Sequence, residues 1–279
     1  MELVVFDLDG TLLNRDSEIS AFTSETLRLL SQNDIAYTVA TGRTLHGARR
    51  ILDGHRFRLP QAYKNGVMIW HPETSRYSSG ATLTPDELDN VVSACLGQRL
   101  TPFVFTLDED NDSTVYHPPL VSKIERRLVE SISLDEHTRV CPLDDLPGDA
   151  TVTHINAIGA SNAITAVLRS VDKEPHLVAY SGFALEGEQW RWLDVHHTDA
   201  SKGGAIKSLK ELLGVEHVIC FGDSDNDLSM FEAADESYAP NNANDRIKSA
   251  ATAVIGHHDE DGIARFLRER FALGNEVSS

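Results

Sequence analysis

The stretch LVVFDLDGTLLN, residues 3–14, decides how the rest of the sequence is interpreted. Its first four residues form a short, continuously apolar run, which is typical of a strand buried on both faces of a parallel sheet. Two aspartates, Asp7 and Asp9, follow directly. Ionised carboxylates at the end of a buried strand are costly to desolvate unless a positive group holds them. We therefore expect a cation beside them, held by residues from other parts of the chain.

Residues 1–80 alternate between strand patterns and helix patterns. LVVFDL and IAYTVATG are strand-like, whereas SAFTSETLRLLSQND and RTLHGARRIL are helix-like. QAYKNGVMIW is expected to form two strands joined by a tight turn at Asn65-Gly66. Regular alternation of strand and helix predicts a parallel sheet with helices on both faces.

The pattern changes at about residue 84. TPDEL carries a capping box and opens a helix, and PFVFTL and STVYHP read as a hairpin around the acidic turn DEDND. From RWLDV we expect the α/β pattern to return, with a helix at SKGGAIKSLKELLG and a buried strand at HVICF. The sequence thus predicts a core domain of residues 1–83 and 184–279 and an inserted α+β domain of residues 84–183. The last residues, GNEVSS, are expected to be frayed.

Composition limits the classes of function. The 279 residues are 41% hydrophobic, an ordinary globular value, and their net charge of −18 argues against a nucleic-acid binder. An anionic substrate then needs a local positive site. Three scattered cysteines predict neither a disulfide framework nor a zinc cluster. No apolar run approaches the ~18 residues of a membrane span, so we expect a cytoplasmic protein, and no protein partner is evident.

Four polar clusters follow strands or open helices. In an open parallel sheet the carboxyl ends of the strands border one crevice, so we expect the clusters to meet there. Carboxylate oxygens are ligands that Mg²⁺ prefers, and hydroxyl, backbone N–H and ammonium groups bind phosphate oxygens. Together they predict a magnesium and phosphate site. The clusters are Asp7 with Asp9, Thr41-Gly42-Arg43, Lys202, and Asp223 with Asn226 and Asp227 in GDSDND.

These motifs resemble those of the haloacid dehalogenase-like phosphohydrolase superfamily. DLDGTLL is similar to its first motif, TGR to its second, the lysine of SKGGA to its third and GDSDND to its fourth, in the same order. The insertion resembles the large α/β cap of the Cof-type phosphatases. The resemblance covers essentially the whole chain, and it implies a Rossmann-like, doubly wound parallel sheet core with an inserted α+β cap domain.

The resemblance also implies roles for individual residues. Asp7 would be the nucleophile that forms an aspartyl-phosphate, and Asp9 the general acid and base. Mg²⁺ would bind the Asp7 carboxylate, the Asp9 backbone carbonyl and Asp223. Asn226 and Asp227 would position the lysine, the phosphate or the waters of the metal, and Asp227 is counted among the metal ligands.

The remaining residues are assigned to the phosphate and substrate. Thr41 and Lys202 would hold the phosphoryl group, helped by the backbone N–H groups of Leu8 and Gly42. Asn65, in KNGV, matches a family asparagine near the pocket. Arg43 is counted with them, although structural contacts at the start of its helix are the alternative.

We therefore expect a Mg²⁺-dependent phosphatase that acts on a small phosphorylated metabolite, with a sugar phosphate as the expected substrate. Two alternatives stay open: a phosphomutase with the same aspartyl chemistry, and a non-catalytic metabolite-binding regulatory module. The pairs His196-His197 and His257-His258 invite a metal interpretation, but neighbouring residues of a strand point to opposite faces and make a poor chelate. We therefore interpret both pairs as solvated surface.

Overall fold

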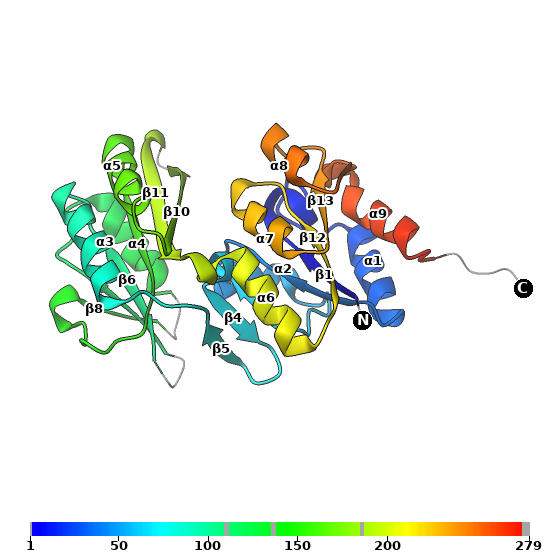
Figure 1. Ribbon diagram of the computed structural model, residues 1–279, viewed down its shortest axis with the longest axis horizontal. Coiled ribbons are helices and arrows are strands. Elements are labelled where there is room, and N and C mark those ends of the chain that lie inside the picture. Colours follow the sequence, from blue (N-terminus) through cyan, green and yellow to red (C-terminus); the bar gives the residue numbers. More distant parts are fainter. Residues whose placement is uncertain (1, 109–111, 135–137, 185–186, 275–279) are drawn as a thin grey trace, which may run out of the picture. The chain divides into compact units, whose positions relative to one another are not determined.

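The computed structural model describes residues 2–108, 112–134, 138–184 and 187–274. It divides into two compact units. The first comprises Met1–Ser78 and Ser201–Ser279, and the second comprises Ser79–Ala200. Figure 1 follows the chain through them in colour, from blue through green in the second unit to red. The first unit is built on a five-stranded sheet with an apolar cluster on each face, and the second on a six-stranded sheet with an apolar cluster of its own.

The first unit is built on a five-stranded sheet in which every pair of neighbouring strands is parallel. Strand β1 lies inside the sheet between β12 and β2, and Phe6 is in register with Phe221 on one side and Val39 on the other. The strands, in spatial order, are β14 (Ala253–Ile255), β13 (Glu236–Pro240), β12 (His217–Phe221), β1 (Glu2–Phe6) and β2 (Ala36–Val39).

Helices cover both faces of this sheet, as the strand and helix alternation predicts. On one face, side chains of α1 (Ala21–Gln32), α2 (Leu45–Leu52) and α9 (Gly262–Arg270) pack with alternate residues of β1 such as Val4 and Phe6. On the other face, Leu3 and Val5 pack with α6 (Lys202–Leu213), α7 (Leu228–Ala233) and α8 (Asp245–Ala250). All four of these strand side chains are fully buried.

Local sequence signals set where the helices begin and end. The Ser20, Thr44 and Ser201 side chains accept hydrogen bonds from the first-turn backbone N–H groups of α1, α2 and α6. Gly214 ends α6 in a left-handed conformation, with φ of 60°. After β2 the chain forms a small sheet, β3 (Gln61–Tyr63), β4 (Met68–His71) and β5 (Arg76–Ser79), with the expected turn at Asn65-Gly66.

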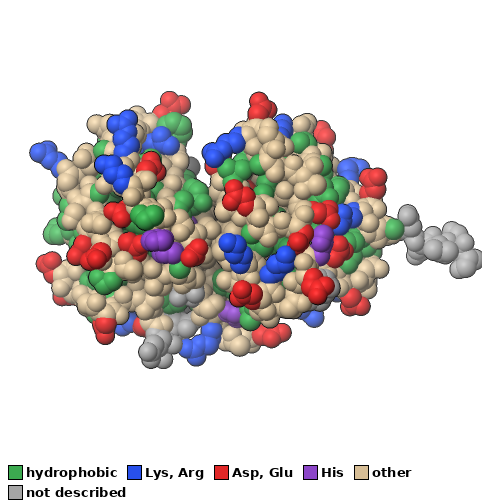
Figure 2. Space-filling model, in the orientation of Figure 1, with side chains coloured by type: hydrophobic (Ala, Val, Ile, Leu, Met, Phe, Trp, Pro, Cys, Tyr) green, Lys and Arg blue, Asp and Glu red, His purple; other side chains and the backbone are tan. Residues whose placement is uncertain are grey.

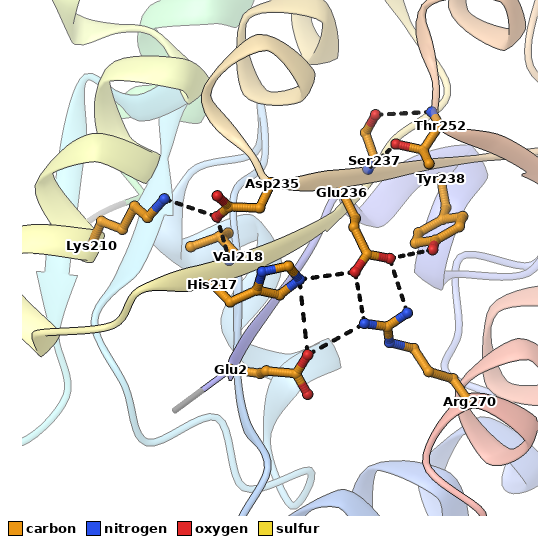
Figure 3. A network of polar contacts seen from close by, with 10 residues as sticks. All are labelled: Glu2, Lys210, His217, Val218, Asp235, Glu236, Ser237, Tyr238, Thr252 and Arg270. Atoms are coloured by element: carbon orange, nitrogen blue, oxygen red, sulfur yellow. Dashed lines mark hydrogen bonds and ion pairs between the residues drawn. The ribbon is translucent and has the colours of Figure 1, made fainter.

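A polar network ties the amino-terminal edge of the core sheet together, at the opposite end of β1 from Asp7 (Figure 3). The carboxylate of Glu236, on β13, accepts hydrogen bonds from Tyr238 and from Arg270 of α9, at 2.8 and 2.9 Å for the two guanidinium nitrogens. His217 Nε2 lies 2.8 Å from Glu236 Oε1. Arg270 also contacts Glu2 at 3.3 Å. The network links three neighbouring strands to the last helix.

The second unit holds a six-stranded sheet whose strand pairs are antiparallel except for β7 with β8. α3 (Pro85–Gly97), opened by the predicted capping box at Thr84, and α5 (Ser161–Val171) pack with the apolar residues of one sheet face. α4 (Lys123–Ile132) follows β7. In spatial order the strands are β10 (Leu177–Ala184), β11 (Gly187–His197), β9 (Val152–Ala160), β6 (Phe103–Leu107), β7 (Ser113–His117) and β8 (Thr138–Pro142).

One part of the sequence interpretation is wrong. RWLDV does not return to the core, because β11 pairs with β9 and β10 in the second sheet. The alternating pattern of RWLDV suits a strand in either sheet, and its partners decide which one it joins. The hairpin of PFVFTL and STVYHP is present as β6 and β7. Residues 109–111 of its acidic turn and the expected frayed end at 275–279 lie outside the described residues.

The charged surface mixes both signs. On the face that Figure 2 shows, Lys and Arg side chains are scattered among Asp and Glu side chains. Within the described ranges, no helix is both long and apolar enough to pass through a membrane.

Candidate active site

Asp7 lies at the carboxyl end of β1, held by the strand beside it. Its backbone N–H donates to the carbonyl oxygen of Phe221 at 2.9 Å, and its side chain is buried. The chain then turns through Leu8–Leu12, where Gly10 has a φ of 72°. A Cβ atom at Gly10 would lie 2.4 Å from Asp223 Oδ2, so glycine is required both for the turn and for the approach of Asp223.

Lys202 joins two of the sequence clusters from the first turn of α6. Its ammonium donates to Asp7 Oδ1 at 2.5 Å and to Asp227 Oδ1 at 2.6 Å. The lysine and Asp227 are fully buried, and Asp7 nearly so. Gly66 of the turn after β3 lies against the start of α6, since a Cβ there would be 2.2 Å from the Ser201 carbonyl oxygen. The helix start, and with it the lysine, is thereby fixed against the core.

The charges in this buried group are not balanced. Asp7, Asp223 and Asp227 bring three carboxylates, whereas Lys202 is the ammonium between two of them. Burial raises the pKa of Asp7 to about 7, and the nearby Lys202 offsets this only in part. Burial, with the charge of Asp227, raises the pKa of Asp223 to about 6. Burial alone would lower the pKa of Lys202, but its two carboxylate partners raise it.

The GDSDND loop places two aspartates in different ways. Asp227 Oδ2 accepts hydrogen bonds from the backbone N–H groups of Asp223 and Ser224, at 2.9 and 3.0 Å. Its other oxygen accepts a hydrogen bond from Lys202. Asp227 therefore holds both the backbone of this loop and the ammonium group of the lysine in place. Asp223 Oδ1 accepts a hydrogen bond from Thr11 at 3.2 Å, which ties this loop to the loop after β1.

Asp9 points to a different partner from Asp7. Both of its carboxylate oxygens accept hydrogen bonds from Arg43, from Nε at 2.7 Å and from Nη2 at 2.5 Å. The Asp9 side chain is 56% exposed, whereas that of Arg43 is 24% exposed. Arg43 therefore contacts a proposed catalytic carboxylate, so the alternative of structural contacts at its helix start accounts for only part of its role. The Arg43 Nη1 to Gly47 carbonyl contact at 3.3 Å is that part.

Asn65 connects the second and fourth motifs. Its backbone N–H donates to the Thr41 carbonyl at 2.9 Å, and its Oδ1 accepts a hydrogen bond from Asn226 at 2.8 Å. A Cβ at Gly42 would lie 3.1 Å from the same Oδ1. The Thr41 hydroxyl accepts a hydrogen bond from the Arg43 backbone N–H at 3.2 Å. Asn65 thus holds the TGR loop and the GDSDND loop at a fixed spacing.

The fold brings the predicted residues together at one edge of the core sheet. Leu8 is fully buried, so only its backbone is available to a ligand. Asn242 was missed by the sequence interpretation: its amide donates to the Gly10 carbonyl at 2.7 Å and supports the loop after β1. Its position just after a strand, β13, was the available signal. The interpretation of His196 as solvated surface is wrong, because its side chain is fully buried.

The donor set fits a hard divalent cation. Asp7, Asp223 and Asp227 each have a carboxylate oxygen within 4.8 Å of the others. Both oxygens of Asp227 already accept hydrogen bonds, from Lys202 and from two backbone N–H groups, so Asp7 and Asp223 are the better candidates to hold an ion. An all-oxygen set suits Mg²⁺ better than a softer metal. A divalent cation beside these carboxylates would offset the excess of negative charge and would favour the ionised forms of Asp7 and Asp223, whose pKa values are raised in its absence.

The core is thus a parallel sheet with helices on both faces, with a buried lysine between two carboxylates where its strands end. The chain belongs to the haloacid dehalogenase-like hydrolase family, whose model matches residues 4–267. Within this family it is a phosphatase, an enzyme that hydrolyses phosphoric monoesters. The family predicted from the four motifs is thus confirmed.

Several similar proteins match over nearly their whole length. The phosphatase YwpJ of Bacillus subtilis is 28% identical over 297 residues, which cover 96% of this chain and 99% of that protein. The 5-amino-6-(5-phospho-D-ribitylamino)uracil phosphatase YitU of the same species is 27% identical, with 97% and 98% covered. The structure of a haloacid dehalogenase-like hydrolase from B. subtilis has a TM-score of 0.72 at 24% identity, covering 96% and 99% of the two chains.

Proposed function

We propose that this phosphatase is Mg²⁺-dependent and hydrolyses a small phosphorylated metabolite, a sugar phosphate or a related polyol phosphate, through an aspartyl-phosphate on Asp7. The observation that carries the proposal is the buried bridge of Lys202 between Asp7 and Asp227. A fixed ammonium beside a strand-end carboxylate supplies positive charge where a transferring phosphoryl group would gain negative charge.

In the first step, an oxygen of Asp7 attacks the phosphorus of the ester and the bond to the leaving oxygen breaks. Asp9 donates a proton to that oxygen, which departs as an alcohol. Thr41, the backbone N–H groups of Leu8 and Gly42, and Lys202 hold the phosphoryl oxygens. Arg43 here contacts both oxygens of Asp9, so one of the two contacts must open before Asp9 can carry the proton that it donates, and the remaining contact orients the carboxyl group.

In the second step, Asp9 takes a proton from a water molecule, whose oxygen attacks the phosphorus. The bond to Asp7 breaks, and inorganic phosphate leaves with the carboxylate restored. Mg²⁺ would be held by Asp7, the Asp9 backbone carbonyl and Asp223, and its charge would offset repulsion between the carboxylates and the phosphate. Asp227 holds the lysine and the loop that carries Asp223.

The buried ammonium group of Lys202 supports a phosphorylated substrate. The names of similar proteins support the kind of molecule that carries the phosphate. YitU is named for a substrate with a phosphorylated ribityl chain, and a solved structure of similar fold is that of a subclass IIB sugar phosphatase, with a TM-score of 0.72 at 20% identity. We propose that the inserted residues, 84–183 in the sequence prediction and Ser79–Ala200 as the compact unit, supply recognition of the leaving group. Catalytic groups are proposed only in the first unit.

Rapid quenching in acid after mixing with a ³²P-labelled substrate tests the proposal. Wild-type protein with Mg²⁺ should carry label, and Asp7→Asn should carry none and lose turnover by about a thousandfold or more while keeping its circular dichroism spectrum. Asp16→Asn, at an exposed position soon after the same loop, is the matched control. Undiminished turnover by Asp7→Asn would rule out the covalent step. Conversion to an isomeric phosphate, without free phosphate, would favour the phosphomutase alternative.

A further inference from the structure

The sheet of the second unit has two unlike faces. Leu193 and Val195 of β11 point with Ile155 and Ala157 of β9 into the apolar core under α3 and α5. The residues between them along the strands point to the other face. There the register pairs Asp194 of β11 with Asn156 of β9 and His196 with His154. An antiparallel sheet commonly has one polar face exposed to solvent, but here Asp194, His154 and His196 are buried.

Two oxygen atoms on this face lack partners. Within the described residues, Asp194 Oδ1 and Asn156 Oδ1 are both buried and neither has a hydrogen-bond donor. The Asp194 side chain as a whole is only 5% exposed. A buried carboxylate oxygen without a donor is destabilising, and most buried polar atoms of folded proteins are paired. Because the two residues are register partners, we infer that a ligand with two hydrogen-bond donors could pair with both oxygen atoms.

An aromatic side chain lies next to the acceptors on the same face. Trp192 precedes Asp194 by two residues on β11, and its register partner on β10 is Gly182. A Cβ at Gly182 would lie 2.7 Å from the indole ring, so the glycine lets the ring lie close over the neighbouring strand. Trp192 is 40% exposed. Tyr180 faces Asp194 from β10, and its ring lies 5.6 Å from that of His196.

We propose that Asp194 and Asn156, with Trp192 beside them, form a subsite that binds vicinal hydroxyl groups of a sugar or polyol. Each hydroxyl donates one hydrogen bond, which is what the two oxygen atoms lack. The carbon-bound hydrogens of a polyol pack on an indole ring, which offers a broad apolar surface with a fixed orientation. The inference rests on the proposed function in taking this polyol to be the leaving group of the phosphate ester.

The burial of Asp194 separates this role from a structural one. A carboxylate kept for the fold would be paired, and its loss would lower stability. An unpaired buried carboxylate instead lowers stability itself, so its neutral and nearly isosteric replacement should leave the melting temperature unchanged or raise it. Loss of binding together with equal or higher stability is therefore the signature of a ligand-binding residue at this position.

The test compares Asp194→Asn with Glu188→Gln in the full-length protein. Glu188 is an exposed carboxylate on the same strand, so the control removes the same charge. With ribitol 5-phosphate, Asp194→Asn should lower kcat/KM roughly tenfold to a hundredfold, the range for a hydrogen bond to a charged group. With 4-nitrophenyl phosphate, which has no hydroxyl groups on its leaving group, the change should stay within about twofold. Trp192→Leu should show the same selective loss.

Calorimetric titration with ribitol, which carries no phosphate, tests binding without turnover. Wild-type protein and Glu188→Gln should bind it, and Asp194→Asn should bind at least about tenfold more weakly. Equal losses for both phosphate substrates, wild-type ribitol binding by Asp194→Asn, or a lower melting temperature of that variant would each overturn the inference. If the wild-type protein bound ribitol but hydrolysed neither ester, the proposed function would fail while the subsite stood.

Discussion

Arg43 donates two hydrogen bonds to Asp9, one to each carboxylate oxygen, at 2.7 and 2.5 Å. The two residues come from different loops, after β1 and after β2. A bidentate contact between a guanidinium and a carboxylate fixes direction as well as distance. The carboxylate proposed to move protons is thus oriented by a residue of the second sequence motif.

Replacement of Arg43 should lower the hydrolysis rate most for esters with poor leaving groups. An alkyl alcohol leaves only with a proton, whereas 4-nitrophenolate leaves readily without one. Arg43→Gln should therefore lower kcat by about tenfold to a hundredfold for alkyl phosphates, on the scale of general acid catalysis, and far less for 4-nitrophenyl phosphate. Steady-state kinetics with both esters measure this, with the exposed Arg50→Gln of the same helix as control. A uniform loss for both esters would instead place Arg43 on the phosphate.

Loss of Lys202 should affect both rate and stability. Lys202→Met removes the ammonium between Asp7 and Asp227 and leaves two carboxylates buried without it, which should cost about 3–5 kcal/mol of unfolding free energy. The transition state should lose about 2–4 kcal/mol of stabilisation. Urea unfolding and kcat/KM at low temperature measure the two effects. Lys207→Met, at an exposed position of α6, should change neither, and a stable, active Lys202→Met would contradict the assignment.

Magnesium should support both turnover and stability. Chelation should abolish hydrolysis and added Mg²⁺ should restore it, whereas Ca²⁺ should substitute poorly because its coordination is larger and looser. Bound at about 100 times its Kd, Mg²⁺ should add about 2.7 kcal/mol to the free energy of unfolding. Differential scanning calorimetry with and without chelator detects this. Asp223→Asn should lower the affinity for Mg²⁺ at least about tenfold. Asp225→Asn, which changes an exposed aspartate of the same loop, should leave this affinity unchanged.

The network around Glu236 should make stability depend on pH in the acid range. Burial opposes ionisation of Glu236, but its hydrogen bonds from Tyr238, His217 and Arg270 outweigh it and lower the pKa of the carboxyl (Figure 3). A lowered pKa stabilises the folded state above the ordinary value of 4.5, and this contribution is lost as the pH falls through the lowered value.

Glu236→Gln should therefore lower the unfolding free energy by about 1 kcal/mol at pH 7, the size of a typical hydrogen-bond contribution. The difference from wild type should shrink as the pH falls below the ordinary value. Urea unfolding at pH 7 and pH 4 measures it. Glu232→Gln, at an exposed position of α7, is the control; a difference that grew at low pH would show that Glu236 is bound in its protonated form.

Much of the core could be predicted from the sequence because its signals are local. The apolar run before Asp7, the cap at Ser201 and the left-handed Gly214 each act within a few residues. Strand partners are not local, which is why RWLDV was given to the wrong sheet. The contact of Arg43 with Asp9 and the burial of Asp194 depend on which loops and strands become neighbours. The sequence therefore indicated which residues come together in the site. It did not indicate which atoms of these residues contact one another.

The pairing of β1 with β12 has a consequence for folding during translation. The ribosome releases β1 and β2 early, but β12 emerges only after the whole of Ser79–Ala200. That inner unit is continuous in sequence, so it can complete its own sheet while the first strands still wait with an open edge. Asp7 meets Lys202 and Asp223 only after the carboxyl-terminal segment has been translated. A nascent chain released near residue 200 would therefore contain the whole inner unit but lack β12, Lys202 and Asp223, so it would be inactive and would leave an edge of β1 unpaired.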